Sequence, residues 1–147
     1  MCCPRGGPVV ENKKIIVFTC NWNAYHGLQA AGAGRISYDP RTIPIRLTCI
    51  GRISTGIILK AFEQGAMGVL LLGCPKDDCQ YDSGIRLAEK AVLEAKKILA
   101  LLGYSEDRLR LDHLEAGEGK AFTEKVNEFV KRLDKLIVYK NNDGKTP

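Results

Sequence analysis

The sequence contains no apolar run that approaches the about 18 residues required for a membrane-spanning helix. Its beginning, MCCPRGGPVVENKK, also lacks the long apolar core of a secretory signal. These two absences predict a cytoplasmic protein with no direct membrane insertion.

Basic segments that alternate with aromatic residues are also absent, although the formal net charge is +5 and the pI is about 8.9. Lysines are interleaved with acids instead, as in Glu89-Lys90 and Glu94-Ala95-Lys96-Lys97. Such interleaving is typical of a solvated helix face. We therefore expect no nucleic-acid partner.

No internal repeat or linker divides the 147 residues into two domains. A chain of this length buries roughly 68% of its unfolded surface, which is enough for a core without disulfides. The contents of hydrophobic residues (45%) and charged residues (27%) are near those of ordinary soluble proteins. We predict one domain at 13–138, between flexible tails at 1–12 and 139–147.

Short apolar runs alternate with longer segments whose apolar residues have helical spacing. The predicted strands are 15–20, 43–49, 68–74 and 108–114, and the predicted helices are a segment ending in AAGAGR (30–35), 54–64, 83–102 and 118–136. This alternation predicts an α/β fold with one open parallel β-sheet of about four strands and flanking helices, flavodoxin-like in general plan. The alternating pattern of 108–114 predicts an edge strand.

Six cysteines stand at positions 2, 3, 20, 49, 74 and 79. In a reducing compartment, free thiols are more often metal ligands or redox groups than disulfides. Cys2 and Cys3 precede the predicted domain, in a segment rich in proline and glycine, and we assign them no structural role. The other four fall within the predicted domain.

Three of these four cysteines end predicted strands. The carboxyl ends of parallel strands meet at one edge of an open sheet, where such folds bind their ligands. Cys20, Cys49 and Cys74 should therefore share one rim, and Cys79 adds a C-x4-C loop. A single buried cysteine is commonly a small core residue, but core packing does not explain four thiols at one rim.

The stretch TCNWNAY (19–25) looks like a C-x-x-C motif in which Asn23 replaces the second cysteine. The four remaining thiolates suit either a tetrahedral zinc ion or an iron–sulfur cluster. Zinc sites usually combine two C-x2-C knuckles, whereas these ligands come singly from separate strands plus one C-x4-C pair. That spacing favours an iron–sulfur cluster, and a zinc ion remains the alternative.

The neighbours of these cysteines suit an anionic cluster. Arg52 and Lys76 bring positive charge that would raise a reduction potential, although each could equally be a solvated surface cation. Trp22 and Tyr25 could shield the site, contact a partner or pack in the core.

Independent catalysis is not expected, because no set of nucleophile, base and acid stands out; we assign no catalytic residue. We interpret His26 and His113 as structural. Gly32-Ala33-Gly34 does not follow a strand directly, so it indicates a helix stop and not a phosphate-binding loop.

Four longer motifs carry a family resemblance: CNW-x-x-Y (20–25), C-x-GR (49–52), LKAFE-x-GA-x-GVL-x-x-GC (59–74) and DC-x-Y (78–81). From about 15 to 136 the chain resembles the delta subunit of methyl-viologen-reducing hydrogenase, a small iron–sulfur protein associated with heterodisulfide reductase. Asn23, Asp77 and Gln80 stand where that family usually has cysteine, glycine and histidine. These departures suggest a divergent branch, such as one serving a benzoyl-coenzyme A reductase or methylenetetrahydrofolate reductase complex.

The resemblance implies a [2Fe–2S] cluster that relays electrons between a donor module and a flavin- and iron–sulfur-containing protein of the heterodisulfide reductase A type. The donor would be a hydrogenase, reductase or dehydrogenase module of the same complex. The expected ligands are Cys20, Cys49, Cys74 and Cys79, with Arg52, Lys76, Trp22 and Asn23 around them. The alternatives are a structural zinc site or a metal-free adaptor.

Overall fold

The computed structural model describes residues 14–142, and it describes side chains at 14–138. The predicted N-terminal tail, with Cys2 and Cys3, lies outside the described residues. Most of the predicted C-terminal tail does too. No helix in the described part of the chain is both long enough and apolar enough to cross a membrane.

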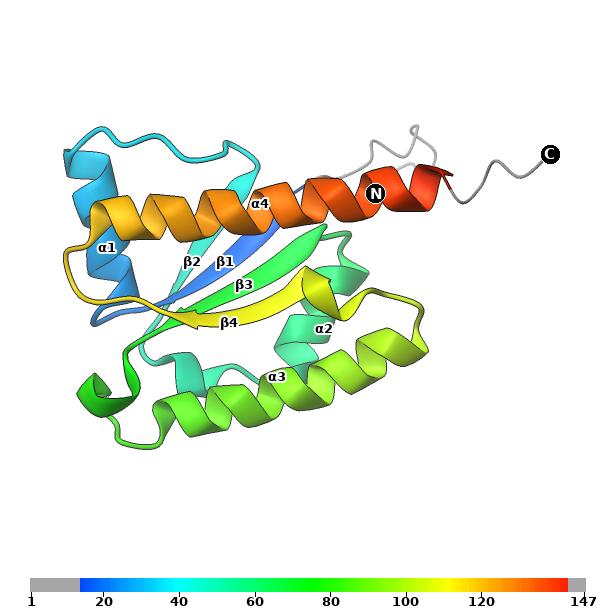
Figure 1. Ribbon diagram of the computed structural model, residues 1–147. Helices are drawn as coiled ribbons and strands as arrows, with labels where there is room; N and C mark the ends of the chain where they lie inside the picture. Colours follow the sequence, from blue (N-terminus) through cyan, green and yellow to red (C-terminus); the bar gives the residue numbers. More distant parts are fainter. Residues whose placement is uncertain (1–13, 143–147) are drawn as a thin grey trace, which may run out of the picture.

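Four parallel strands form one open sheet in the order β2-β1-β3-β4 (Figure 1). They are β1 (Ile15–Cys20), β2 (Thr42–Leu47), β3 (Gly68–Gly73) and β4 (Leu109–His113). This order matches the first four strands of the flavodoxin-like arrangement, whose direction of winding reverses between β1 and β3. The predicted fold class and the edge position of the fourth strand are confirmed.

Within residues 14–142, four α-helices cover the two faces of the sheet (Figure 1). They are α1 (Ala24–Ala33), α2 (Thr55–Glu63), α3 (Gly84–Leu101) and α4 (Gly119–Asn142). Helices α1 and α4 pack together on one face, while α2 and α3 pack together on the other. This distribution is what right-handed crossovers between parallel strands produce.

The last helix is longer than predicted. The apolar pattern predicts an end near Leu136, but α4 continues to Asn142, so the proposed boundary at 138 falls inside a helix. Leu133 is buried, and Ile137, one turn later, packs against the core. The apolar stripe that holds α4 on the sheet therefore extends past the predicted end.

Three short 3-10 turns are not evident from the sequence: η1 (Ile50–Arg52), η2 (Lys76–Asp78) and η3 (Glu106–Arg108). The turn η1 shortens the second strand, which was expected to reach Cys49 but ends at Leu47. Cys49 instead caps η1, and its sulfur accepts a hydrogen bond from the Gly51 N–H at 3.4 Å. A side chain that competes for local backbone donors in this way favours a turn over a continued strand.

The core lies on both faces of the two central strands. Every residue of β3 is buried, and β1 is nearly so. Edge strand β2 is more exposed, which explains why it accommodates Pro44, a residue that cannot donate to a sheet ladder. The central pair therefore fixes the positions of the loops that follow β1 and β3.

Close contact between α1 and α4 depends on Gly119, the first residue of α4. A Cβ atom there would overlap the backbone of Ala30 and Ala31, which cannot rotate away as a side chain can. By contrast, a Cβ atom at Gly32 in α1 would meet nothing within 4 Å. The two glycines therefore form a matched pair for a test.

We expect Gly119→Ala to lower the free energy of unfolding by about 2 kcal/mol or more, because the helices must separate. Gly32→Ala should raise it by about 0.5–1 kcal/mol, because alanine loses less entropy than glycine in a helix. Urea denaturation followed by circular dichroism measures both changes. An unaltered midpoint for Gly119→Ala would show that this helix contact is not tight.

Candidate metal centre

Two buried thiols meet where the sheet reverses its winding direction. Cys20 is the last residue of β1, and Cys74 directly follows β3. Their sulfurs are 3.4 Å apart, although the residues are 54 positions apart in the sequence, and their exposed fractions are only 1% and 4%. The prediction that separate strands bring thiols to one rim is thus confirmed for this pair.

Two further thiols converge on the first residue of α3. A Cβ atom at Gly84 would lie 2.5 Å from the Cys49 sulfur and 3.1 Å from the Cys79 sulfur. A real Cβ atom essentially never approaches another atom as closely as the first of these distances, so the sulfurs use space that only a glycine leaves open. No local sequence signal points to Gly84, because a glycine at the start of a predicted helix looks like an ordinary boundary residue.

Backbone N–H groups stabilise negative charge on the Cys20 sulfur. The hydrogen bond with Cys74 lowers the pKa of Cys20 to about 6, while burial acts in the opposite direction. The N–H groups of Asn23 and Ala24 add hydrogen bonds to the sulfur at 3.4 and 3.3 Å. The pKa of Cys74 is raised, because it shares its proton with Cys20 and is buried. One sulfur of the pair therefore carries negative charge readily.

The other two thiols differ in their access to solvent. Burial raises the pKa of Cys49, and the hydrogen bond from Gly51 opposes that effect. Cys79 is partly exposed. The rim therefore has a buried side at Cys20 and Cys74 and a more open side at Cys79.

Four cysteine thiols of the described residues lie in this region. Thiolates are the usual ligands of iron–sulfur clusters and of structural zinc, so the residues present fit either group. The space at Gly84, kept open for two of them, supports the same fit. Among the residues that the structure describes, no three His, Cys, Asp or Glu side chains are arranged to hold a single metal ion. The sulfurs form two pairs instead of a preformed single-ion site.

Asn23, the residue in place of a motif cysteine, connects two of the loops. Its side-chain Nδ2 donates a hydrogen bond to Asp78 Oδ2 at 2.8 Å, and it is 5% exposed. The bond joins the turn after β1 to η2, which precedes Cys79. Asn23 therefore contacts the surroundings of two thiols. Its backbone N–H donates a hydrogen bond to the Cys20 sulfur, and its side chain holds Asp78, the residue before Cys79.

The other predicted neighbours lie at the surface of the rim. Arg52 is exposed at the end of η1, where its backbone N–H donates to the Cys49 carbonyl oxygen at 3.1 Å. Lys76 forms an ion pair with Glu89 at 2.9 Å, which offsets its charge. Trp22 is 38% exposed, so it is not a core residue.

His113 is a residue of the site that the sequence does not reveal. Its ring Nδ1 lies 3.0 Å from the carbonyl oxygen of Cys74. Because a carbonyl only accepts hydrogen bonds, Nδ1 carries the proton in this contact. The end of β4 thereby holds the backbone of a thiol residue in the loop after β3, a pairing across 39 positions that no local pattern shows.

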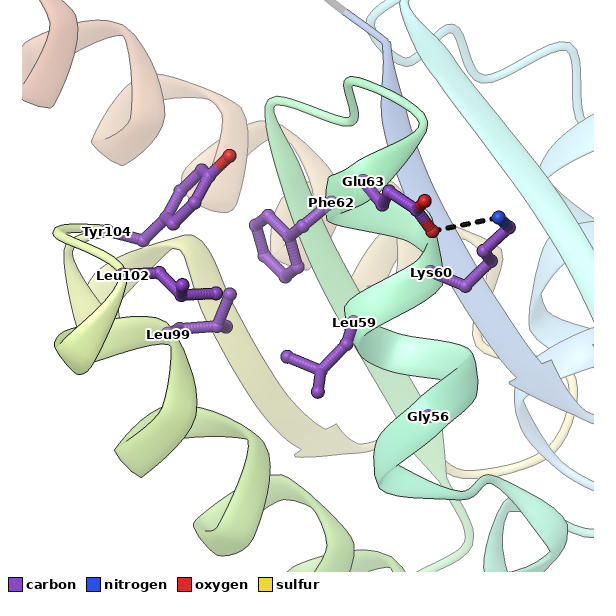
Figure 2. A pocket seen from close by; sticks show the side chains of 8 residues that line it. All are labelled: Gly56, Leu59, Lys60, Phe62, Glu63, Leu99, Leu102 and Tyr104. Atoms are coloured by element: carbon purple, nitrogen blue, oxygen red, sulfur yellow. Dashed lines mark hydrogen bonds and ion pairs between the residues drawn. The ribbon is translucent and has the colours of Figure 1, made fainter.

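An apolar groove of about 480 Å³ lies elsewhere, between α2 and the far end of α3 (Figure 2). Phe62 and Tyr104 meet edge to face there, and the Lys60–Glu63 ion pair lies at one side. Leu99 in its lining follows Gly84 by about 15 residues, which is about 22 Å along a helix. The end of the groove at Leu99 is therefore remote from the thiols.

Comparison with known proteins identifies one family. A profile described as "Methyl-viologen-reducing hydrogenase, delta subunit" matches residues 15–136. An iron–sulfur subunit of the F420-non-reducing hydrogenase vhc of Methanococcus voltae is 37% identical, with 90% of this chain and 93% of that protein covered. The corresponding iron–sulfur subunit of the F420-non-reducing hydrogenase of Archaeoglobus profundus is 35% identical, with 86% and 92% covered.

A longer relative contains only one part that resembles this chain. It is the polypeptide designated A of the ferredoxin/F(420)H(2)-dependent CoB-CoM heterodisulfide reductase of Methanosarcina acetivorans, which is 36% identical over 122 residues. The match covers 83% of this chain but 15% of that protein. Most of that polypeptide therefore has no counterpart here.

The bond between Asn23 and Asp78 can be tested by a double-mutant cycle. We expect Asn23→Ala and Asp78→Ala to be coupled by about 1 kcal/mol in the free energy of unfolding, because each removes the other's partner. Asn23→Ala and Asp77→Ala should show coupling near zero. Anaerobic urea denaturation of metal-free protein measures both cycles, and equal coupling in the two would refute the assignment.

Proposed function

The chain belongs to the methyl-viologen-reducing hydrogenase delta subunit family, and on that premise we propose that it is a non-catalytic electron-transfer subunit carrying one [2Fe–2S] cluster. The observation that carries this proposal is the convergence of four thiols from the ends of the strands and the loops that follow them. Relatives named as iron–sulfur subunits of hydrogenases support it. A bound cluster would accept and release single electrons.

Cys20, Cys49, Cys74 and Cys79 would hold the cluster. The N–H groups of Asn23 and Ala24 already point at the Cys20 sulfur, and such donors stabilise added negative charge and so raise a reduction potential. The buried pair would keep water from one side of the site. The more open side, at Cys79 and the exposed Trp22, would face the electron partner.

The proposed partner is a flavin- and iron–sulfur-containing protein of the heterodisulfide reductase A type. A relative of that name contains a segment resembling this domain within a much longer chain, which supports a working association between the two. The loops that would contact it carry Trp22, Arg52 and Tyr81, all of them exposed, and Tyr81 is 47% exposed. Electrons would reach the rim from a hydrogenase, reductase or dehydrogenase module.

Metal content tests the proposal directly. Protein purified without oxygen should be brown and contain about two irons and two acid-labile sulfides per chain. Serine at position 20, 49, 74 or 79 should remove that iron, whereas Cys2→Ser and Cys3→Ser should retain it. Stoichiometric zinc without iron or sulfide would establish the structural zinc alternative, and protein without either would establish a metal-free adaptor.

Gly84→Ala tests the site without removing a thiol. We expect it to lose most of the iron, because its methyl group would displace the sulfurs of Cys49 and Cys79. Gly32→Ala is the matched control and should retain the iron. Iron analysis and visible absorption, with circular dichroism to verify folding, measure the outcome; a folded Gly84→Ala protein with full iron content would contradict this placement of the sulfurs.

Association with a flavoprotein tests the partner. A chain carrying an affinity tag at its C-terminus should recover flavin and iron from an anaerobic native extract. Arg52→Glu should reduce recovery about tenfold or more, because it reverses a charge at the proposed contact. Lys97→Glu, an exposed position on α3 remote from the thiols, should not. Equal recovery with both variants would exclude the rim as the interface.

A further inference from the structure

We propose that Cys20 and Cys74 form a reversible disulfide when the chain holds no metal, and that this bond prevents the site from being loaded. The inference concerns the metal-free chain and therefore goes beyond the proposed electron-transfer role. Three observations carry it: the separation of the two sulfurs, the register of their strands and the pairing of the four thiols.

The separation of the sulfurs is the first observation. At 3.4 Å they are already in contact, and a disulfide requires them to close to about 2.05 Å. A change of this size needs small rotations of the side chains and no rearrangement of the sheet. Both residues are buried, so only a small oxidant, such as hydrogen peroxide, could reach the two sulfurs.

The register of β1 and β3 is the second observation. Thr19 pairs with Leu72 in the parallel ladder, so Cys20, at the end of β1, and Cys74, directly after β3, lie at the ends of two neighbouring strands. Cys74 is outside the strand, so its side chain does not follow the alternation between the two faces of the sheet. It turns toward Cys20 instead, as the contact between the two sulfurs shows. The bond would therefore join two segments that already leave the sheet side by side.

The pairing of the thiols is the third observation. Cys49 and Cys79 both lie against the backbone of Gly84, at the start of α3, whereas Cys20 and Cys74 contact each other between the central strands. Cys49 and Cys79 also interact with each other, but the sulfurs of Cys20 and Cys74 are in contact at 3.4 Å, so we expect one equivalent of oxidant to join Cys20 to Cys74 first. The bond would withdraw two of the four proposed ligands.

The chemistry balances with hydrogen peroxide as the oxidant. The Cys20 sulfur, which accepts hydrogen bonds from two backbone N–H groups, attacks one peroxide oxygen as the thiolate and becomes a sulfenic acid, releasing hydroxide. The Cys74 sulfur then displaces the sulfenic oxygen, which leaves as water after taking up the Cys74 proton, while the proton first lost by Cys20 neutralises the hydroxide. Two thiols lose two electrons in total, and one peroxide is reduced to two waters.

The test uses the full chain with Cys2→Ser and Cys3→Ser, stripped of metal without oxygen and then treated with one equivalent of peroxide. We expect the intact mass to fall by two hydrogen atoms and two of the four thiols to resist alkylation. Peptide mapping should join the peptide of β1 to that of β3. Cys49→Ser should give the same cross-link, whereas Cys20→Ser and Cys74→Ser should give none.

Loading provides a second readout. The oxidised chain should take up no cluster from iron and sulfide until dithiothreitol restores the thiols, after which uptake should equal that of untreated protein. A cross-link between Cys49 and Cys79, sulfinic acid without any cross-link, or full loading of the oxidised chain would each overturn the inference. Failure of the untreated, reduced chain to bind iron would instead refute the proposed function and leave the cross-link result standing.

Discussion

Parallel pairing of β1 with β3 is the constraint on which the rest of the molecule depends. It places the carboxyl ends of two buried strands side by side at the point where the sheet reverses its direction of winding. The connections leaving the two strands cross to opposite faces there, and open parallel sheets generally bind their ligands at such a point. The position of Cys20 beside Cys74 follows from this pairing, and the loops with Cys49 and Cys79 are arranged around it.

The parts of the structure that depend on local pattern could be predicted from the sequence. The strand Ile15–Cys20 lies at its predicted bounds, because a short apolar run rich in β-branched residues strongly favours a buried strand. The strand Gly68–Gly73 and the rim position of Cys74 follow from the same kind of signal. Family membership was predicted from four short motifs and is confirmed by a match across most of the chain.

The early end of β2 depends on a local hydrogen bond at Cys49, but the other features that escaped prediction depend on contacts between distant segments. The role of Gly84 is visible only once two sulfurs from other loops approach it. The Asn23–Asp78 bond and the contact from His113 to the Cys74 carbonyl likewise join residues separated by 55 and 39 positions. The end of α4 was missed because the packing of the partly buried Ile137 depends on the core beneath it. In these four cases a tertiary partner, absent from any local window, determined the outcome.

The direction of the strands also determines how this domain can be attached to other chains. β1 begins at the end of the sheet that lies opposite the cysteines, where the strands have their amino ends, and α4 finishes near the same end (Figure 1). A covalent linker continuing from Ile15 or from Asn142, near the two ends of the described domain, would thus start about one strand length or more away from the thiols and would not need to pass over them. Gene fusion can then embed such a domain in a larger polypeptide without obstructing the end of the sheet that carries the cysteines. This arrangement is compatible with the heterodisulfide reductase polypeptide of which a similar segment forms 15%.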